Sequence, residues 1–316
     1  MEHGLFIGID GGGTHSTAAA AFSDGRIAAV CEGGGLNFHN AGVEPVRSRL
    51  EEMTRELCRQ AQAGVEEACV GMSALDLPAD EATTALFTGG VFTPEQLDLQ
   101  SDAYAALMGL TQGNPGVIVI CGTGSMLVTL DADGTQHVSG GWGYLLGDAG
   151  SSYTLSREAL LAAIDFFEDL GPATALAQDA LGYFGASSPR GLIDCIYPLP
   201  PEKVAGFARF VLQRAQEGDE IALEIVERNM RRLARQAAHM VHQHPSAHRI
   251  GLYGGVFAHS ELARSLFVKE LLSLSPEAQV CSPDYPPELG AIIHLFRKRG
   301  MLTPEVLANL KNTYQK

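Results

Sequence analysis

The amino-acid sequence predicts an α/β protein built from two related lobes. Two segments, residues 5–31 and 117–139, share one order of features: an apolar strand, a glycine loop, a second strand, an Asp-Gly turn and a third strand. An internal repeat of this kind indicates two similar structural units. A chain of 316 residues also suits two lobes better than a single core.

The first segment begins with an apolar run at residues 5–9, which predicts a buried strand. A glycine loop with the sequence DGGGTHS follows at residues 10–16. Small and apolar residues at 17–22 predict the second strand. Asp24 and Gly25 form a strong two-residue hairpin signal, which leads into a third strand at 27–31.

The second segment repeats this pattern. Residues 117–121 are an apolar strand, and the glycine loop GTGS occupies residues 122–125. A strand is expected at 126–130, a turn at Asp133 and Gly134, and the start of a third strand at 137–139. The repeat lies in the architecture rather than in residue identity.

The rest of the chain is mostly helical. Val46, Leu50, Met53 and Leu57 recur at helical spacing with charged residues between them. Further strands are expected at 68–72, 97–100 and 249–253. Further helices are expected at 102–110, 151–170, over most of 201–243, and at about 259–273, 287–298 and 303–313. The junction between the lobes is expected near residues 113–116.

Composition limits the classes of function. The apolar fraction of 46% and charged fraction of 19% are those of a globular protein. The net charge of −15 repels nucleic acid and anionic membranes, so we expect neither as a partner. The N-terminus has no signal-peptide pattern, which favours the cytoplasm. The six cysteines are scattered without a CxxC pair, and the ten histidines have no metal-binding spacing.

The glycine loops do not fit two common nucleotide motifs. A P-loop requires a Gly-Lys pair, which neither loop contains. A dinucleotide-binding loop must open a helix, whereas these loops lead into strands. Glycines between two strands let the backbone approach an anion closely, and nearby hydroxyl groups can add donors. Asp10 stands where a carboxylate can hold Mg²⁺. Ordinary hairpin turns are the alternative interpretation.

Five motifs, in order along the chain, resemble those of the BadF/BadG/BcrA/BcrD ATPase family, and within it those of N-acetylglucosamine kinases. Residues 8–14 (GIDGGGT) resemble the first phosphate motif, and 122–125 (GTGS) the second. Residues 140–151 (GGWGYLLGDAGS) are similar to the most characteristic segment of the family. Residues 253–256 (YGGV) resemble the adenosine motif, and 287–291 (PELGA) the opening of a late helix.

The resemblance implies an actin-like ATPase with two ribonuclease-H-like lobes around a central cleft. The expected N-terminal lobe is 1–113, with a C-terminal helix at 290–316 packing back on it, and the C-terminal lobe is 114–289. The implied function is an ATP-dependent kinase that phosphorylates an amino sugar such as N-acetylglucosamine, at O6, in a homodimer. ATP and Mg²⁺ are the implied cofactors, with Asp10 as the metal ligand. The implied nucleotide-binding residues are Gly11, Gly12, Gly13, Thr14, Ser16, Gly122, Thr123, Gly124, Ser125, Gly254, Gly255 and Val256.

Asp102 matches the catalytic aspartate of the family. A sugar hydroxyl is a poor nucleophile, so a carboxylate placed on its proton acts as general base. The alternative is that Asp102 caps the helix that it begins. The implied sugar contacts are Asn37, Ser73, Asp102, Gly141, Trp142 and Asp148. Asn37 is otherwise a turn residue, and Asp148 is otherwise a cap of the helix near residue 151.

Ala149 departs from the family pattern, which commonly carries a glutamate there. The acceptor sugar therefore stays open between N-acetylglucosamine, glucosamine and a muramyl sugar. A second alternative is an activator ATPase of a dehydratase, but such proteins hold an iron–sulfur cluster, which requires grouped cysteines. A sugar sensor without catalysis and a kinase of the ROK type are further alternatives, and the zinc-binding cysteine cluster common in ROK kinases is absent from the sequence.

Overall fold

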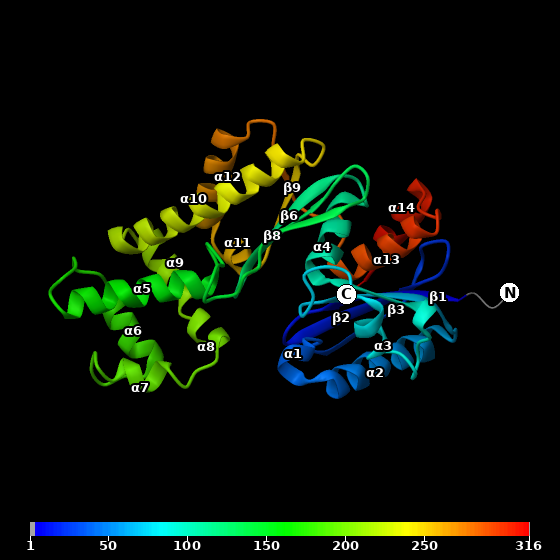
Figure 1. Ribbon diagram of the computed structural model, residues 1–316, viewed down its shortest axis with the longest axis horizontal. Coiled ribbons are helices and arrows are strands. Elements are labelled where there is room, and N and C mark those ends of the chain that lie inside the picture. Colours follow the sequence, from blue (N-terminus) through cyan, green and yellow to red (C-terminus); the bar gives the residue numbers. More distant parts are fainter. Residues whose placement is uncertain (1–3, 316) are drawn as a thin grey trace. The chain divides into compact units, whose positions relative to one another are not determined.

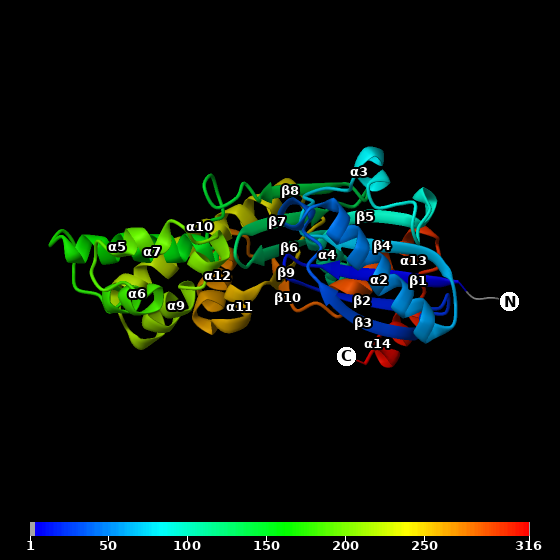
Figure 2. The same cartoon turned by 90° about the horizontal axis from the view of Figure 1, so that it is seen from below.

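The first five strands form one mixed sheet in the computed structural model, which describes residues 4–315. The strands are β1 (Leu5–Gly11), β2 (His15–Ala21), β3 (Ile27–Gly34), β4 (Val65–Met72) and β5 (Leu97–Ser101). Their order is β3-β2-β1-β4-β5, and Figure 2 shows them side by side. The strand β1 runs antiparallel to β2 and parallel to β4, which in turn is parallel to β5.

The second sheet repeats this plan. Its strands are β6 (Gly116–Cys121), β7 (Ser125–Leu130), β8 (Gln136–Gly140), β9 (Arg249–Tyr253) and β10 (Gln279–Cys281). Read from β8, the order β8-β7-β6-β9-β10 has the same form as the order of the first sheet. The predicted repeat is therefore confirmed, and it covers five strands rather than three. The short strand β10 and the length of the repeat were not predicted.

The predicted helices are present with small changes at their ends. The long helix expected at 151–170 is α5 (Ser152–Phe167), because the chain leaves the helix at Glu168 and Asp169 takes a left-handed φ of 58°. The expected helical region 201–243 is three helices, α8 (Pro201–Ala205), α9 (Ala208–Glu217) and α10 (Glu220–Gln243). The remaining elements are α1 (Phe38–Ala41), α2 (Val43–Ala61), α3 (Glu81–Ala85), η1 (Pro94–Gln96), α4 (Asp102–Thr111), α6 (Leu176–Phe184), α7 (Leu192–Ile196), α11 (Gly255–His259), α12 (Glu261–Leu274), α13 (Pro287–Lys298) and α14 (Pro304–Thr313).

Helix α13 packs closely on the first sheet and on α4, as can be followed in Figure 1. A Cβ added at Gly8 of β1 would overlap the carbonyl oxygen of Glu288, and one added at Gly290 would overlap that of Ala105. On the other side of the sheet, Val46, Leu50, Met53 and Leu57 of α2 are buried in the core as their spacing predicted. Helices from both ends of the chain thus support β1.

A partly buried polar network joins α13 to β5 and α4. His294 lies between Asp98 and Tyr104, with Nε2 3.1 Å from Asp98 Oδ2 and Nδ1 3.0 Å from Tyr104 Oη. Lys298 donates to Asp98 Oδ2 at 2.9 Å. Burial acts to raise the pKa of Asp98, but the bond with His294 and its charge outweigh burial and hold this pKa well below its ordinary value. The network fixes the position at which β5 becomes α4.

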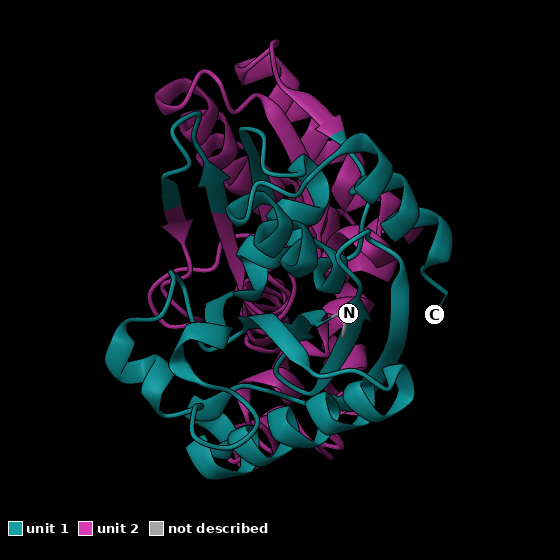
Figure 3. Cartoon of the chain, turned by 90° about the vertical axis from the view of Figure 1, so that its right-hand side faces the viewer, with its two compact units in different colours: residues 1–118, 128–137, 281–316 teal, residues 119–127, 138–280 magenta. Residues whose placement is uncertain are grey.

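The chain divides into two compact units (Figure 3). Unit 1 holds residues 1–118, 128–137 and 281–316, and unit 2 holds residues 119–127 and 138–280. The lobe boundaries expected from the sequence stay a prediction. Residues 1–3 and 316 lie outside the described residues. Part of the signal-peptide argument and the start of the expected N-terminal lobe fall on residues 1–3. The expected returning helix ends at residue 316.

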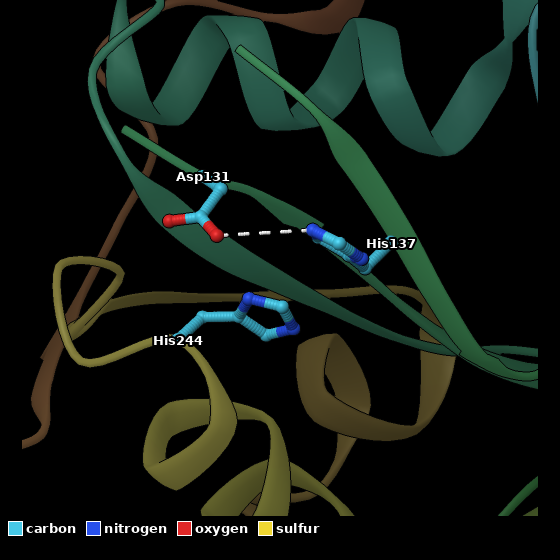
Figure 4. A group of neighbouring side chains, drawn as sticks. All are labelled: Asp131, His137 and His244. Atoms are coloured by element: carbon cyan, nitrogen blue, oxygen red, sulfur yellow. Dashed lines mark ion pairs between the residues drawn. The ribbon is translucent and has the colours of Figure 1, made fainter. Parts of the chain in front are cut away.

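The turn between β7 and β8 carries an ion pair of its own. His137 Nε2 lies 3.8 Å from Asp131 Oδ2, a pair that forms a salt bridge when the imidazole is protonated (Figure 4). About a third of each side chain is exposed, so the pair contributes at most about 1 kcal/mol. His244, also labelled in Figure 4, follows α10 and belongs to unit 2. No helix in residues 4–315 has the length and apolar character needed to cross a bilayer.

Candidate active site

The predicted residues of unit 1 gather where three parallel strands end. Gly11 of β1 pairs in register with Met72 of β4, and Met72 pairs with Ser101 of β5. Ser73 and Asp102 therefore stand one residue beyond the aligned carboxyl ends of their strands. Ligands of α/β proteins bind outside the carboxyl ends of parallel strands. The structure brings Asp10, Ser73 and Asp102 to one edge of the first sheet.

The first glycine loop is packed backbone against backbone. A Cβ on Gly11 would come within 2.5 Å of the Gly71 carbonyl oxygen, and a Cβ on Gly35 would overlap the carbonyl oxygen of Gly13. Gly13 itself has no atom within 4 Å on its open side, and Thr14 is exposed. Ser16 is buried, and its hydroxyl donates to Gly34 O at 2.9 Å. The expected hydroxyl donor at residue 16 thus holds the loop rather than facing outward.

Asn37 and Ser73, two predicted sugar contacts, lie together. Asn37 Nδ2 donates to Ser73 O at 3.3 Å, and Asn37 Oδ1 accepts from the backbone N–H groups of His39 and Asn40. Asn37 is therefore the N-cap of α1. This local structural role is compatible with its predicted role as a sugar contact. Both side chains remain half-buried.

Asp102 is not the cap of the helix that it begins. The N-cap of α4 is Ser101, whose hydroxyl accepts from Tyr104 N at 3.0 Å. Asp102 Oδ1 accepts a hydrogen bond from the neighbouring Ala103 N–H at 2.7 Å. Burial raises the pKa of Asp102 to about 6, and the negative charge of Asp76 adds to the rise. A carboxylate with a pKa close to neutral is suited to accept a proton from a substrate.

Asp76 was missed by the sequence analysis. It lies in the exposed stretch after β4, three residues beyond Ser73, and its charge reaches the carboxylate of Asp102. Its place just after the end of a parallel strand was the available signal, because side chains there lie at the ligand-binding edge.

In unit 2 the second glycine loop, residues 122–124, connects β6 to β7. Gly122 has no atom within 4 Å on its open side, and Thr123 is exposed. Ser125 is buried, and its hydroxyl donates to Ala149 O at 2.8 Å. As with Ser16, the expected hydroxyl donor is used to hold the backbone. A Cβ on Gly254 of the predicted adenosine motif would come within 2.5 Å of Cys121 O, so this motif lies against the base of the loop.

Asp148 stands over the second glycine loop. A Cβ on Gly124 would lie 2.8 Å from Asp148 Oδ2. Asp148 is 6% exposed, takes a left-handed φ of 60°, and its Oδ1 is buried without a hydrogen-bond partner. Burial raises its pKa. Asp148 is not the cap of α5, because Ser151 is. Helix capping therefore does not explain why Asp148 Oδ1 is buried without a hydrogen-bond donor.

The segment before Asp148 is exposed and apolar. Trp142 is 73% exposed, and Leu145 and Leu146 are about four-fifths exposed. Gly140, Gly141 and Gly143 all have positive φ values, a conformation that favours glycine. Trp142 is therefore not a core residue. Exposed apolar side chains beside a buried acceptor suit a ligand with a hydrophobic face and hydroxyl edges.

A cavity of ≈ 350 Å³ in unit 2 includes part of the predicted adenosine motif. Gly255 and Val256 line one side, Ser152 at the start of α5 another, and α9 contributes Arg209 and Gln213. The α9 residues were not predicted, because nothing in their helical pattern marks them as a binding surface. The guanidinium of Arg209 lies 5.0 Å from the ring centre of Phe210. A larger cavity of ≈ 580 Å³, between β3 and α2, contains none of the predicted site residues.

The donor set at the first loop fits a hydrated Mg²⁺. Asp10 is a half-buried carboxylate at the end of β1, directly before a glycine loop with an open side. Mg²⁺ takes one or two carboxylates together with waters and phosphate oxygens. The glycine loops fit phosphate because their backbone is uncovered at Gly13 and Gly122.

Comparisons with known proteins show the family to which the chain belongs. The model of the BadF/BadG/BcrA/BcrD ATPase family matches residues 7–294. The N-acetyl-D-glucosamine kinase of Dictyostelium discoideum is 26% identical over 93% of this chain and 98% of its own. The N-acetylmuramic acid/N-acetylglucosamine kinase of Clostridium acetobutylicum is 29% identical over 72% of this chain and 76% of its own.

A solved structure shows the same fold. It is a candidate N-acetylglucosamine kinase from Chromobacterium violaceum, with a TM-score of 0.78 at 23% identity. The alignment covers 93% of this chain and 100% of the other. At this level of identity the similarity shows the fold alone, and it confirms the α/β architecture expected from the repeat.

Proposed function

Because this chain belongs to the BadF/BadG/BcrA/BcrD ATPase family, we propose that it is an ATP-dependent kinase that phosphorylates an amino sugar such as N-acetylglucosamine, at O6. The observation that carries the proposal is Asp102, a carboxylate of raised pKa at the ligand-binding edge of the first sheet, where another residue caps the helix. The curated relatives, which are amino-sugar kinases, support the class of acceptor. The proposal includes a homodimer and the lobe boundaries expected from the sequence.

Each part of the site has a role in this proposal. Asp102 accepts the proton of the attacking sugar hydroxyl. The sugar is bound by Asn37, Ser73, Gly141, Trp142 and Asp148. The two glycine loops hold the phosphates through backbone N–H groups, and the cavity at Gly255 and Val256 receives the adenosine. Asp10 holds Mg²⁺, which neutralises charge on the transferred phosphoryl group when bound.

Asp148 supports a hydroxyl group rather than a phosphate as its partner. Its buried Oδ1 has no donor within the described structure, and a sugar hydroxyl supplies one. Phosphate oxygens are acceptors and would be repelled by the same carboxylate. In the proposed site, the group that donates a hydrogen bond to Asp148 is therefore a sugar hydroxyl.

An ADP-release assay over a panel of acceptors tests the proposal. The panel contains N-acetylglucosamine, glucosamine, N-acetylmuramic acid, glucose and a control without sugar. We expect sugar-dependent ADP release with an amino sugar as the preferred acceptor. Phosphorus NMR of the product then distinguishes O6 from the other hydroxyls. ADP release at the same rate without any sugar would contradict the kinase and favour an ATPase.

Replacing Asp76 with Asn should shift the pH dependence of the reaction. Asp102 must be ionised to accept a proton, so kcat should fall as the pH drops through about 6. Removing the negative charge of Asp76 lowers the pKa of Asp102 and moves this midpoint to lower pH. The measurement is kcat against pH from 4.5 to 8. Glu81→Gln, which removes an exposed acid from α3, is the control, and a midpoint in Asp76→Asn equal to that of the control would contradict the prediction.

Replacing Asp148 with Asn should weaken sugar binding selectively. Asn tolerates the left-handed backbone found here, so the turn keeps its shape while the charge is lost. A hydrogen bond to a charged group contributes about 1.5–3 kcal/mol, so KM for the sugar should rise roughly 10- to 100-fold. KM for ATP should change much less. Equal rises in both constants would remove Asp148 from the sugar site.

A further inference from the structure

The turn that carries Asp148 and the second glycine loop form one hydrogen-bonded body. We call residues 147–151 the Asp148 turn. Ser125 Oγ donates to Ala149 O at 2.8 Å, and Cys121 Sγ lies 3.1 Å from Gly150 O, so both ends of the loop hold the turn. In return Ser152 N, just after the turn, donates to Gly122 O at 2.8 Å. A displacement of the turn therefore moves the loop, and a displacement of the loop moves the turn.

One buried side chain outside this body anchors it. Asn229 of α10 is 2% exposed, and its Oδ1 accepts from Gly150 N at 3.1 Å. Its Nδ2 donates to Glu158 Oε2 of α5 at 2.7 Å and to Ile225 O at 3.0 Å. Gly150 has a φ of 80°, and a Cβ there would lie 3.0 Å from Met230 Cε. The turn is thus pinned to α10 at its glycine.

The chemistry of residue 229 is specific. Only an amide offers an acceptor to the Gly150 N–H and, at the same time, donors to a carboxylate and a carbonyl. A leucine of similar volume would leave the Gly150 N–H without its acceptor and would remove one of the two donors to Glu158 Oε2, the other being Arg228. An aspartate would place a second carboxylate beside Glu158. Asn229 lies on the buried face of α10, together with Ile225, Val226 and Met230. Packing of the core does not need an amide there, but the Asp148 turn does.

On the basis of the proposed function, we propose that Asn229 is a positioning residue that makes sugar binding and nucleotide binding depend on each other. The sugar binds Asp148, and the nucleotide binds the second glycine loop. A ligand that orders one of these segments orders the other, because the hydrogen bonds between them are shared. The second ligand then binds a segment that is already ordered, which gives positive coupling. Without the anchor at Gly150, the turn no longer keeps Ala149 O and Gly150 O in place for Ser125 and Cys121. The turn and the loop then move independently, so a ligand that orders one no longer orders the other, and the coupling decreases.

The test compares sugar affinity with and without nucleotide. Calorimetry gives the Kd of N-acetylglucosamine alone and in saturating nonhydrolysable ATP analogue, and the ratio of the two values is the coupling. We expect at least about a fivefold ratio for the natural chain and a ratio within about twofold of unity for Asn229→Leu. A merely structural role would lower both affinities and leave the ratio unchanged. The inference is overturned if folded Asn229→Leu has the same ratio of Kd values as the natural chain. It is also overturned if the ratio in the natural chain is one.

Two further variants keep the test decisive. Arg228→Gln removes the half-exposed outer partner of Glu158, 2.8 Å away, and should keep the natural ratio. The exchange Glu158→Gln with Asn229→Asp reverses the donor and acceptor between α5 and α10 and keeps an acceptor for Gly150. It should restore the ratio to within about twofold of the natural value. If Asn229→Leu does not fold, the deciding comparison is between this double exchange and Asn229→Asp alone. An equal ratio of Kd values in these two variants would overturn the inference.

A measurement without sugar separates this inference from the proposed function. Hydrogen exchange followed by mass spectrometry should show faster exchange in the peptide over 147–153 of Asn229→Leu, with the rest of α10 unchanged. Unaltered exchange there overturns the anchoring role. If the natural chain binds no sugar of the panel, the proposed kinase function fails, while the exchange result still decides whether Asn229 holds the turn.

Discussion

Asp102→Asn should lower kcat by about 10²- to 10⁴-fold, the usual contribution of a general base. The amide has the shape of the carboxylate and retains an acceptor for Ala103 N–H, but it cannot take a proton from the sugar hydroxyl. The Kd for ATP should change little, because the nucleotide is assigned to the glycine loops and the cavity in unit 2. The measurements are steady-state kinetics and calorimetry. Turnover within a few-fold of the natural chain would remove Asp102 from the mechanism.

The same substitution should stabilise the fold at neutral pH. Burial raises the pKa of Asp102 from 3.8 to about 6, so the folded state disfavours the charged form. The cost is absent below the unfolded pKa and develops as the pH rises through about 6. At pH 8 it is on the order of 2–3 kcal/mol, which Asn does not incur. Thermal unfolding should show equal Tm values near pH 4 and a higher Tm for Asp102→Asn at pH 8.

Ser101→Ala is the control for this experiment. It removes the cap of α4 and should lower the free energy of unfolding by about 1 kcal/mol. A loss of kcat in Ser101→Ala as large as that in Asp102→Asn would mean that Asp102 acts only through the start of the helix. A small loss of kcat in Ser101→Ala together with a large loss in Asp102→Asn identifies the carboxylate as the acting group.

Gly8→Ala should lower the free energy of unfolding by about 2–4 kcal/mol, near the upper end for one added methyl group. The new Cβ would overlap Glu288 O and lie 2.8 Å from Ile292 Cγ1, and neither a backbone carbonyl nor a buried isoleucine can move aside. Helix α13 would have to shift away from β1. Denaturant unfolding gives the free-energy change directly, from the midpoint and slope.

Gly64→Ala is the matched control. Gly64 precedes β4, has no atom within 4 Å of an added Cβ, and has no positive φ. Its substitution should change the free energy of unfolding by less than about 1 kcal/mol. Replacing glycine with alanine at such a site usually increases the free energy of unfolding. Equal destabilisation in the two variants would mean that the close approach of α13 does not explain the effect at Gly8.

The sequence predicted most of the fold because its signals are local. Apolar runs marked β1 and β6, and Asp-Gly pairs marked the hairpins, so both meanders were found. The spacing of Val46 and Leu50 predicted α2 and its buried face. Short elements without periodicity, such as α1 and β10, were missed because three to five residues do not establish a period.

The site was predicted less completely, because hydrogen bonding across distant segments leaves no local pattern. The meeting of Asn37 with Ser73 could be expected only through the family motifs. The hydroxyl groups of Ser16 and Ser125 were expected as donors to an anion, and in the structure each is buried and bonds a carbonyl more than 15 residues away in sequence. Asn229 stands among apolar residues of α10, and this polar position on a buried face was the one available signal.

The packing of α13 on β1 sets an order of events during synthesis. Gly8 leaves the ribosome some 280 residues before Glu288 and Ile292, which form the surface that it is shaped to fit. The N-terminal sheet therefore exposes one apolar face until some 280 further residues have been translated. Translation that stops before α13 leaves that face uncovered, so such truncated chains present it to chaperones and proteases, and the first core closes once α13 has been made.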